Sequence, residues 1–214
     1  MTETIITKWV YRYAHKDEPV PDGWVSRLCV GRHGAEGYVI WSRQVRDRQK
    51  DDFYPTPLVA VEALMDVESF EGGIWEPACG DGAISEPFSH YYSVTSTDLN
   101  DYGYGKSGVD FLMESRLLAP NIVTNPPYKH AEAFIQKAIS LQARKHCWLL
   151  RLSFLEGKQR RVSLFDSHRP ARVWVFSQRL TIWRGDEKPS GSGTTAYAWF
   201  VWDGKATDTK VGWL

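Results

Sequence analysis

The segment Asn125-Pro126-Pro127-Tyr128 carries the clearest chemical signal in the chain, and it directly follows an apolar run at residues 122–124. Two consecutive prolines fix the backbone and remove two amide donors, so the carbonyls and the Asn125 side chain can present a rigid set of hydrogen-bond acceptors. Tyr128 could stack on a planar base, or it could simply close a loop. The segment therefore predicts a site for an amino group on a flat ring.

A second chemical segment, residues 76–82, reads Glu-Pro-Ala-Cys-Gly-Asp-Gly and lies where a predicted strand gives way to a helix. Glycines there let a ligand approach the backbone, and open α/β sheets bind cofactors at the carboxyl ends of their strands. The segment lacks the lysine and hydroxyl of a phosphate-binding loop, and Glu76 and Asp81 would repel a polyphosphate. An acidic glycine loop of this kind favours a cationic ligand.

Three further residues favour a nucleoside. Asp98 ends the next predicted strand, about twenty residues after Glu76, which is the interval at which an acidic residue accepts hydrogen bonds from ribose hydroxyls in such folds. Asp110 offers a carboxylate to an exocyclic amino group, and Phe111 offers a ring to cover a base. Taken singly, an aspartate after a strand is usually a cap, and a phenylalanine is usually in the core.

Alternating helices and strands must position these side chains. From Phe53 onward the apolar spacing is typical of an α/β layer fold with parallel strands. Thr56 is expected to cap the first helix, with Pro57 at its first position. The expected helices span residues 57–65, 84–91 and 131–143, and the expected strands span residues 74–76, 93–97, 122–124, 148–154, 172–176 and 195–202.

Residues 1–50 are expected to form a separate β element. Two apolar, strand-like runs at 24–30 and 38–41 are separated by several glycines, which favours a hairpin. The charged stretch at 42–52 is expected to be a linker or an exposed strap. We therefore expect a hairpin appendage over residues 1–50 and a second domain over residues 51–214.

Composition narrows the functional classes. The 26 basic and 26 acidic side chains give a formal charge of +0, so the totals do not indicate a strongly basic nucleic-acid-binding protein. Cys29, Cys79 and Cys147 form no CxxC pair, which argues against a disulfide framework and a structural zinc site. Since the sequence shows no signal peptide and no apolar run of membrane-spanning length, we expect a cytoplasmic protein with no metal and no membrane partner.

The order of five elements resembles class I S-adenosylmethionine-dependent amino methyltransferases, specifically the DNA adenine-N6 type. These elements are Tyr-Pro-Thr-Pro at 54–57, the loop at 76–82, Asp98, Asp110-Phe111, and Asn-Pro-Pro-Tyr at 125–128. The resemblance covers about residues 53–202, and the motif order is similar to the gamma arrangement of that group. It implies a Rossmann-like fold, with a mostly parallel seven-stranded sheet and helices on both faces, and S-adenosylmethionine as cofactor.

The resemblance also implies a role for each matching residue. The implied cofactor-binding residues are Tyr54 and Thr56 near the methionine end, Glu76, Ala78 and Gly80 along methionine and ribose, Asp98 at the ribose hydroxyls, and Asp110 and Phe111 at the adenine. The implied catalytic residues are Asn125, Pro126, Pro127 and Tyr128. Asn125 and the Pro126 carbonyl would accept from the target amino group, and Tyr128 would stack on the flipped-out base.

Local basic residues suggest where nucleic acid is bound. Lys158, Arg160 and Arg161 form a cluster, and Trp183 and Arg184 stand at the edge of a loop rich in glycine and serine. The alternative for the cluster is a solvated charged face. Since no separate recognition domain is visible, we expect DNA recognition to fall to loops, to the first fifty residues, or to a specificity subunit or second copy of the chain.

Three functional classes stay open on the sequence alone. The favoured class is a DNA adenine-N6 methyltransferase of a solitary, restriction–modification or phage-like type. The runner-up is an amino methyltransferase acting on RNA adenine or guanine or on a protein glutamine amide, because the same tetrapeptide occurs in such enzymes. The third is a non-catalytic subunit that keeps the fold and binds nucleic acid or a partner.

Overall fold

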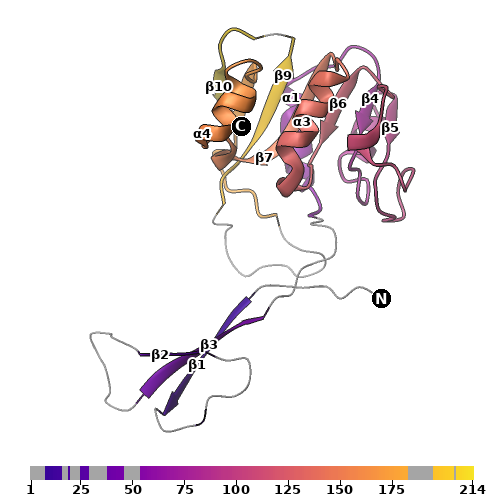
Figure 1. The fold of residues 1–214 in the computed structure, drawn as a ribbon. Coiled ribbons are helices and arrows are strands. Elements are labelled where there is room, and N and C mark those ends of the chain that lie inside the picture. The colour runs from indigo at the N-terminus through magenta and orange to yellow at the C-terminus, as the bar shows by residue number, and fades with distance from the viewer. Residues whose placement is uncertain are drawn as a thin grey trace. The chain divides into compact units, whose positions relative to one another are not determined.

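The computed structural model describes residues 54–182, 195–204 and 206–214, together with Pro19 and the backbone of three strands before residue 46. Contacts within the chain divide it into two units, Met1–Asp52 and Phe53–Leu214, both drawn in Figure 1. No helix in the described part of the chain is both long enough and apolar enough to span a membrane.

The first unit contains a three-stranded antiparallel sheet in the order β1-β3-β2. Strands β2 (Val25–Leu28) and β3 (Tyr38–Val45) pair antiparallel, as the hairpin pattern predicts. Strand β1 (Lys8–His15) was not expected, although its alternating aromatic residues are typical of a strand. The linker prediction is wrong for residues 42–45, because β3 pairs with β1 along its whole length despite its polar end.

The second unit is built on a seven-stranded sheet in the order β10-β8-β9-β7-β6-β4-β5, in which β9 alone runs antiparallel to the others. The strands are β4 (Ile74–Glu76), β5 (Val94–Ser96), β6 (Asn121–Thr124), β7 (Lys145–Arg151), β8 (Arg172–Val175), β9 (Tyr197–Asp203) and β10 (Lys210–Trp213). The expected fold class is therefore confirmed: a Rossmann-like α/β fold built on a mostly parallel seven-stranded sheet.

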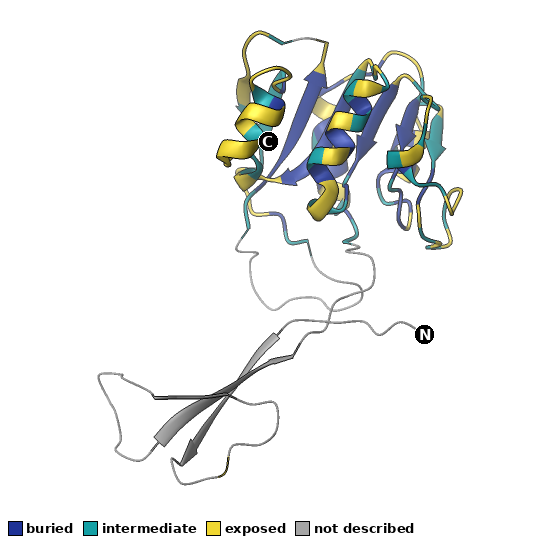
Figure 2. Cartoon of the chain, in the orientation of Figure 1, coloured by how far each residue is buried: buried dark blue, intermediate teal, exposed yellow. Residues whose placement is uncertain are grey.

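Alternation along the strands puts a hydrophobic core on each face of the sheet. Figure 2 shows that most residues of the central strands are buried. In β7, Cys147 and Leu149 join a core with α1 (Leu58–Val67) and α2 (Ser85–Ser89). Trp148 and Leu150 point the other way and pack with α3 (Ala131–Ser140). Because successive strand residues face opposite sides, one continuous apolar run serves both cores, as buried parallel strands require.

Short helical turns complete the unit, and several expected elements end earlier than predicted. The turns are η2 (Phe111–Met113), η3 (Tyr128–His130), η4 (Leu152–Leu155), α4 (Lys158–Arg160) and the π-helical η5 (Arg161–Phe165). The strand expected over 148–154 ends at Arg151, because its partner β9 begins opposite that residue, at Tyr197. The helix expected over 84–91 is confined to Ser85–Ser89.

Strand β10 was not predicted, because its formation depends on a tertiary contact. Gly212 lies against the ring of Trp174 in β8, and a β-carbon at Gly212 would stand only 2.2 Å from that ring. A short run containing glycine gives little strand signal on its own, and pairing with β8 supplies the missing hydrogen bonds.

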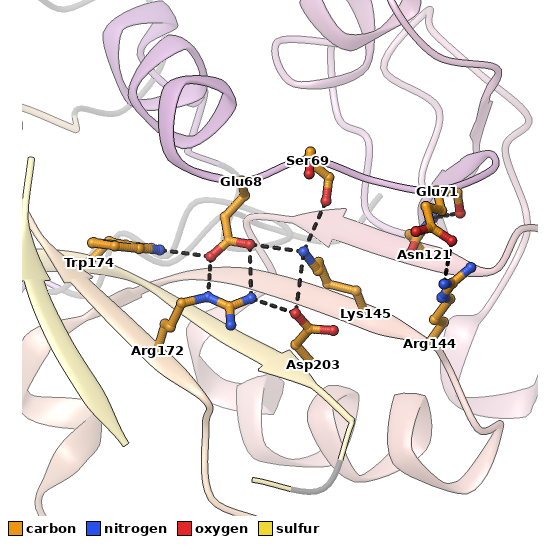
Figure 3. A network of polar contacts seen from close by, with 9 residues as sticks. All are labelled: Glu68, Ser69, Glu71, Asn121, Arg144, Lys145, Arg172, Trp174 and Asp203. Atoms are coloured by element: carbon orange, nitrogen blue, oxygen red, sulfur yellow. Dashed lines mark hydrogen bonds and ion pairs between the residues drawn. The ribbon is translucent and has the colours of Figure 1, made fainter. Parts of the chain in front are cut away.

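A charged network ties α1 to the amino edge of the sheet (Figure 3). Glu68, directly after α1, accepts hydrogen bonds from Lys145 Nζ at 3.0 Å, Arg172 Nη2 at 2.9 Å and Trp174 Nε1 at 2.9 Å. Asp203 lies 2.6 Å from Arg172 Nη2 and 3.4 Å from Lys145 Nζ. Burial alone would raise the pKa of Glu68, but these hydrogen bonds outweigh burial and hold the pKa below its ordinary value.

Removing the charge of Glu68 should destabilise the fold strongly. We expect Glu68→Gln to lower the free energy of unfolding by about 2–4 kcal/mol, because Lys145 and Arg172 would lose a buried counter-charge. Urea unfolding measures the change. The matched control is Glu71→Gln, because Glu71 pairs with Arg144 at the surface, where both side chains are more than half exposed; its effect should stay below about 1 kcal/mol.

The loss of stability in Glu68→Gln should depend on pH. Because the pKa of Glu68 is lowered in the folded chain, its stabilisation is present above its unfolded pKa and is lost as pH falls through the folded value. The difference in unfolding free energy between the parent chain and Glu68→Gln should therefore shrink below about pH 4. A difference that stays constant between about pH 7 and pH 3 would contradict this assignment of the network.

Candidate functional site

The order of the strands defines where a ligand should bind. After β4 the chain forms β5 on one side of it and then β6 on the other, so the path reverses at β4. In open α/β sheets the crevice at the carboxyl ends of the strands around such a reversal is the usual ligand site. Glu76, Asp98 and Asn125 follow or end the strands at this edge, so the fold brings these three candidate residues to one edge of the sheet.

Asp98 connects the glycine loop to the end of β5. Its Oδ2 accepts the backbone N–H of Gly80 at 2.9 Å, and its Oδ1 accepts that of Asn100 at 2.8 Å. Gly80 has a positive φ of 52°. Each carboxylate oxygen has a second lone pair, so Asp98 can still accept from two further donors. The aspartate thus shapes the loop and keeps acceptor capacity for a pair of vicinal hydroxyls.

Glu76 lies below the loop with its side chain buried. It is 2 % exposed and accepts a hydrogen bond from the hydroxyl of Ser85, which in turn lies 2.6 Å from the hydroxyl of Ser96. Burial raises the pKa of Glu76 well above its ordinary value, and the nearby Asp81 and Asp98 raise it further. A cationic group beside Glu76 would oppose this rise in pKa by stabilising the carboxylate, so the position suits a cation.

Tyr104 closes over the glycine loop. Its ring lies so near Gly82 that a β-carbon there would stand 2.6 Å from it, and Gly82 has a φ of 90°. Beside it, Cys79 is 3 % exposed, and burial together with the charges of Glu76 and Asp98 raises the pKa of its thiol to about 12. Cys79 is therefore a small packing residue of the loop.

Asn125 is held in one orientation by the segment that precedes α1. Its Nδ2 donates to the carbonyl oxygen of Tyr54 at 3.1 Å and to the hydroxyl of Thr56 at 3.2 Å. Because a carbonyl can only accept, this pairing decides which end of the amide is the nitrogen. The other end, Oδ1, is buried and has no hydrogen-bond partner among the described residues. An acceptor is thus fixed, desolvated and unused.

This arrangement corrects one prediction about Thr56. The sequence suggested that Thr56 caps the first helix, with Pro57 inside it, but α1 begins at Leu58 and Pro57 stands at the cap position. No side chain caps the helix there. The Thr56 hydroxyl, in a residue that is 8 % exposed, is used instead to position the Asn125 amide.

Tyr128 belongs to a cluster of rings at the same edge. Its ring centroid lies 5.9 Å from that of Tyr54 and 6.1 Å from that of Tyr197. The guanidinium carbon of Arg151, at the end of β7, lies 5.1 Å from the Tyr128 centroid. The structure therefore places a cluster of aromatic rings, with Arg151 against one of them, at the edge of the sheet where Asn125 lies.

The remaining candidate residues are distributed around this edge. Pro126 is buried, and the Pro127 carbonyl accepts the N–H of His130 at the start of α3. The Ala78 carbonyl accepts from Thr124 Oγ1 at 3.4 Å. Asp110 caps η2 by accepting the N–H of Leu112 at 2.9 Å.

Phe111 lies deeper than a ligand platform would. Its ring is 1 % exposed and packs against Trp75 and Phe134, with centroids 5.0 Å away in each case. This placement matches the alternative in which Phe111 is a core residue, and a contact with a bound ring stays a prediction.

The basic residues predicted to bind nucleic acid differ in their contacts. Arg160 donates to the carbonyls of Phe154 and Glu156, both at 2.7 Å, and its guanidinium carbon lies 4.1 Å from the Phe154 ring centroid. Lys158 and Arg161 are exposed, and Arg161 pairs with Asp166 at 3.4 Å. Trp183 and Arg184 lie outside the described residues.

Sequence reasoning did not find Ser85, Ser96, Tyr104 or Arg151. Ser85 bonds the buried Glu76 carboxylate and Ser96 bonds Ser85. No sequence spacing indicates these contacts, because they form only after β4 and β5 pair. Arg151 had one available signal, because it is the charged residue that ends the apolar run of β7 at the edge where the other strands carry chemistry.

Comparison with known proteins gives slight likenesses. No protein-family model and no curated protein matches the chain. A putative hemolysin from Streptococcus thermophilus has 8% identity and a TM-score of 0.49, over 80% of this chain and 73% of that chain. The putative methyltransferase yhhF from Escherichia coli has 13% identity and a TM-score of 0.42, over 75% and 94%. A SAM-dependent O-methyltransferase from Thermotoga maritima has 11% identity and a TM-score of 0.44, over 79% and 75%.

Likenesses of this size do not assign an activity, which must come from the residues of the chain itself.

Crowding between Gly82 and Tyr104 gives a test of the loop. We expect Gly82→Ala to lower the free energy of unfolding by about 1–3 kcal/mol, because the new methyl group meets the Tyr104 ring and alanine disfavours the positive φ. In a Tyr104→Ala background the steric part should vanish, leaving about 1 kcal/mol from the backbone. Thermal or urea unfolding of the double-mutant cycle measures the difference, and strict additivity would contradict the contact.

Proposed function

We propose that the Phe53–Leu214 unit transfers a methyl group from S-adenosylmethionine to the N6 amino group of adenine in DNA. The observation that carries this proposal is the Oδ1 atom of Asn125, which is buried and has no partner among the described residues. An unpaired buried acceptor costs about 1–3 kcal/mol, so its retention points to a donor that comes from a ligand. The amino group of a base is such a donor.

Asn125 can both position and activate that amino group. An exocyclic amino nitrogen is a poor nucleophile because its lone pair is delocalised into the ring. A hydrogen bond from one of its hydrogens to Asn125 Oδ1 would favour a more pyramidal, electron-rich nitrogen and would hold it in line for attack. As the new C–N bond forms, the methyl–sulfur bond would break, the sulfur would leave as a neutral thioether, and the methylated nitrogen would lose one proton to water. Since Tyr54 and Thr56 already fix the amide, the amide itself needs no reorganisation when the base arrives.

The opposite side of the site fits the cofactor. S-adenosylmethionine, when bound, supplies an electrophilic methyl group on a sulfonium sulfur. Asp98 retains lone pairs for the two ribose hydroxyls, and buried Glu76 suits the cationic amino group of the methionine part. The acidic loop and the fixed amide belong to adjacent strands, β4 and β6, which is where donor and acceptor of a methyl group must meet.

DNA adenine is preferred over the other amino substrates for two reasons. The Glu-Pro-Ala-Cys-Gly loop and the Tyr-Pro-Thr-Pro segment resemble the DNA enzymes more than those acting on RNA guanine or a glutamine amide. The ring cluster around Tyr128 also offers a stacking surface, which a base needs and an aliphatic amide does not. A non-catalytic subunit would have no use for a fixed, desolvated acceptor.

The Asn125 amide and the Thr56 hydroxyl that orients it should each contribute to kcat. We expect Asn125→Ala to lower kcat for methyl transfer to adenine-containing DNA by at least about 100-fold, because the acceptor is lost. Thr56→Val keeps the shape but removes the hydroxyl that orients the amide, so kcat should fall by about 10-fold. Thr56→Ser restores the hydroxyl and should recover most of the rate. Incorporation of labelled methyl measures all three.

Circular dichroism and thermal unfolding confirm that each variant is folded before its rate is compared. Equal kcat values for Thr56→Val and Thr56→Ser would remove the positioning role of the hydroxyl. A parent-like kcat in Asn125→Ala would overturn the assignment of the acceptor.

Within the basic cluster, we expect Lys158 and Arg161 to bind DNA and Arg160 to stabilise the fold. We expect Lys158→Ala with Arg161→Ala to weaken DNA binding and to reduce the slope of log K against log [salt] by about 1.5, because two exposed cations are lost. Arg160→Ala should instead lower the free energy of unfolding by about 1–2 kcal/mol, because its donors hold two backbone carbonyls. Fluorescence anisotropy with labelled DNA and urea unfolding measure the two effects; an unchanged salt slope in the double variant would remove the binding role.

A further inference from the structure

Arg151 is an exposed cation at the edge of the site that the proposed reaction does not yet use. It is the last residue of β7, opposite Tyr197 in β9, and its guanidinium lies over the Tyr128 ring. Within residues 54–182, 195–204 and 206–214, no carboxylate lies within ion-pair distance of it. A ring contact at an exposed position is worth only about 0.5–1 kcal/mol, so the guanidinium can leave it.

Charge is distributed unevenly between the two sides of the site. The cofactor side carries Glu76, Asp81 and Asp98, all acidic. The amide of Asn125, by contrast, is held through its nitrogen by two neutral groups, the Tyr54 carbonyl and the Thr56 hydroxyl, and Tyr128, three residues further along, has the Arg151 guanidinium over its ring. A cationic cofactor would be attracted to the first side, whereas an acceptor substrate that bears negative charge would be attracted to the second.

We propose that Arg151 binds the backbone phosphate beside the nucleotide whose base accepts the methyl group; this rests on the proposed function. A guanidinium carries paired donors in a fixed fork that matches phosphate oxygens, and a charge-assisted hydrogen bond is stronger than the ring contact it replaces. Arg151 thus lies on Tyr128 in the free chain and pairs with the phosphate when the base stacks at the ring. The acceptor must then be a nucleotide within a phosphodiester chain.

The chain offers a matched control at the other end of the same strand. Arg144 directly precedes β7, is exposed, and pairs with Glu71 at the amino edge, away from the site. Arg144→Met and Arg151→Met therefore remove the same charge from the same strand at opposite edges of the sheet. Arg151→Lys keeps the charge but loses the fork.

The experiment measures steady-state methyl transfer to an adenine-containing oligonucleotide at several salt concentrations, using the full chain. For Arg151→Met we expect the KM for DNA to rise about 3- to 10-fold and the salt slope of kcat/KM to fall by about 0.7–0.9, one phosphate contact. The KM for S-adenosylmethionine should stay within about 2-fold. Arg151→Lys should keep the salt slope, and Arg144→Met should behave as the parent chain.

A neutral methylphosphonate linkage tests the phosphate directly. The linkage is placed on one side or the other of the target adenosine. It should raise the KM of the parent chain for DNA on one side only, and Arg151→Met should not raise the KM for that modified DNA any further. A parent-like DNA KM and salt slope in Arg151→Met, or a rise in the KM for S-adenosylmethionine instead, would overturn the phosphate contact while leaving methyl transfer intact. No transfer to DNA or RNA by the parent chain, with transfer to a protein amide, would overturn both proposals.

Discussion

The candidate site depends on one side-chain amide that is held by its nitrogen and left open at its oxygen. Two acceptors from the segment before α1, the Tyr54 carbonyl and the Thr56 hydroxyl, receive both donors of Asn125. The segment and the amide are about seventy residues apart in the chain, so the geometry exists only when α1 docks on the sheet. Packing of α1 therefore bears on the proposed reaction as well as on stability, because the segment before its start supplies both hydrogen bonds that orient the amide.

The candidate site and the stabilising Glu68 network lie at opposite edges of the sheet, because the parallel strands share one direction. Parallel strands present all their carboxyl ends at one edge, where Glu76, Asp98, Asn125 and Arg151 gather. At the amino edge, the Glu68 network fixes the end of α1 to β7, β8 and β9 (Figure 3). The two ends of α1 are thus held at opposite edges of the sheet. Its end is held by the buried Glu68 network, and the segment before its start is hydrogen-bonded to the Asn125 amide that would contact the target. A change at Glu68 can reach the site by loosening α1.

The sequence predicted correctly those strands and strand-end residues that an apolar run followed by a polar residue marks on its own. Strand β4 was predicted with its observed bounds, and Asp98 and Asn125 were predicted at strand ends, because apolar runs ended by polar residues need no tertiary information. Prediction failed where a partner far along the chain decides: the end of β7, the existence of β10, and the use of Thr56. The orientation of the Asn125 amide also required the fold, since no spacing shows that a carbonyl from residue 54 will face it.

The chemical identity of the product tests the account most directly. DNA incubated with the chain and isotopically labelled S-adenosylmethionine is digested to nucleosides and analysed by mass spectrometry, with the Asn125→Ala variant in parallel. If the chain methylates adenine in DNA through Asn125, the label appears in N6-methyladenine and is lost in the variant. Label in another nucleoside, or the same N6-methyladenine yield without Asn125, would contradict it.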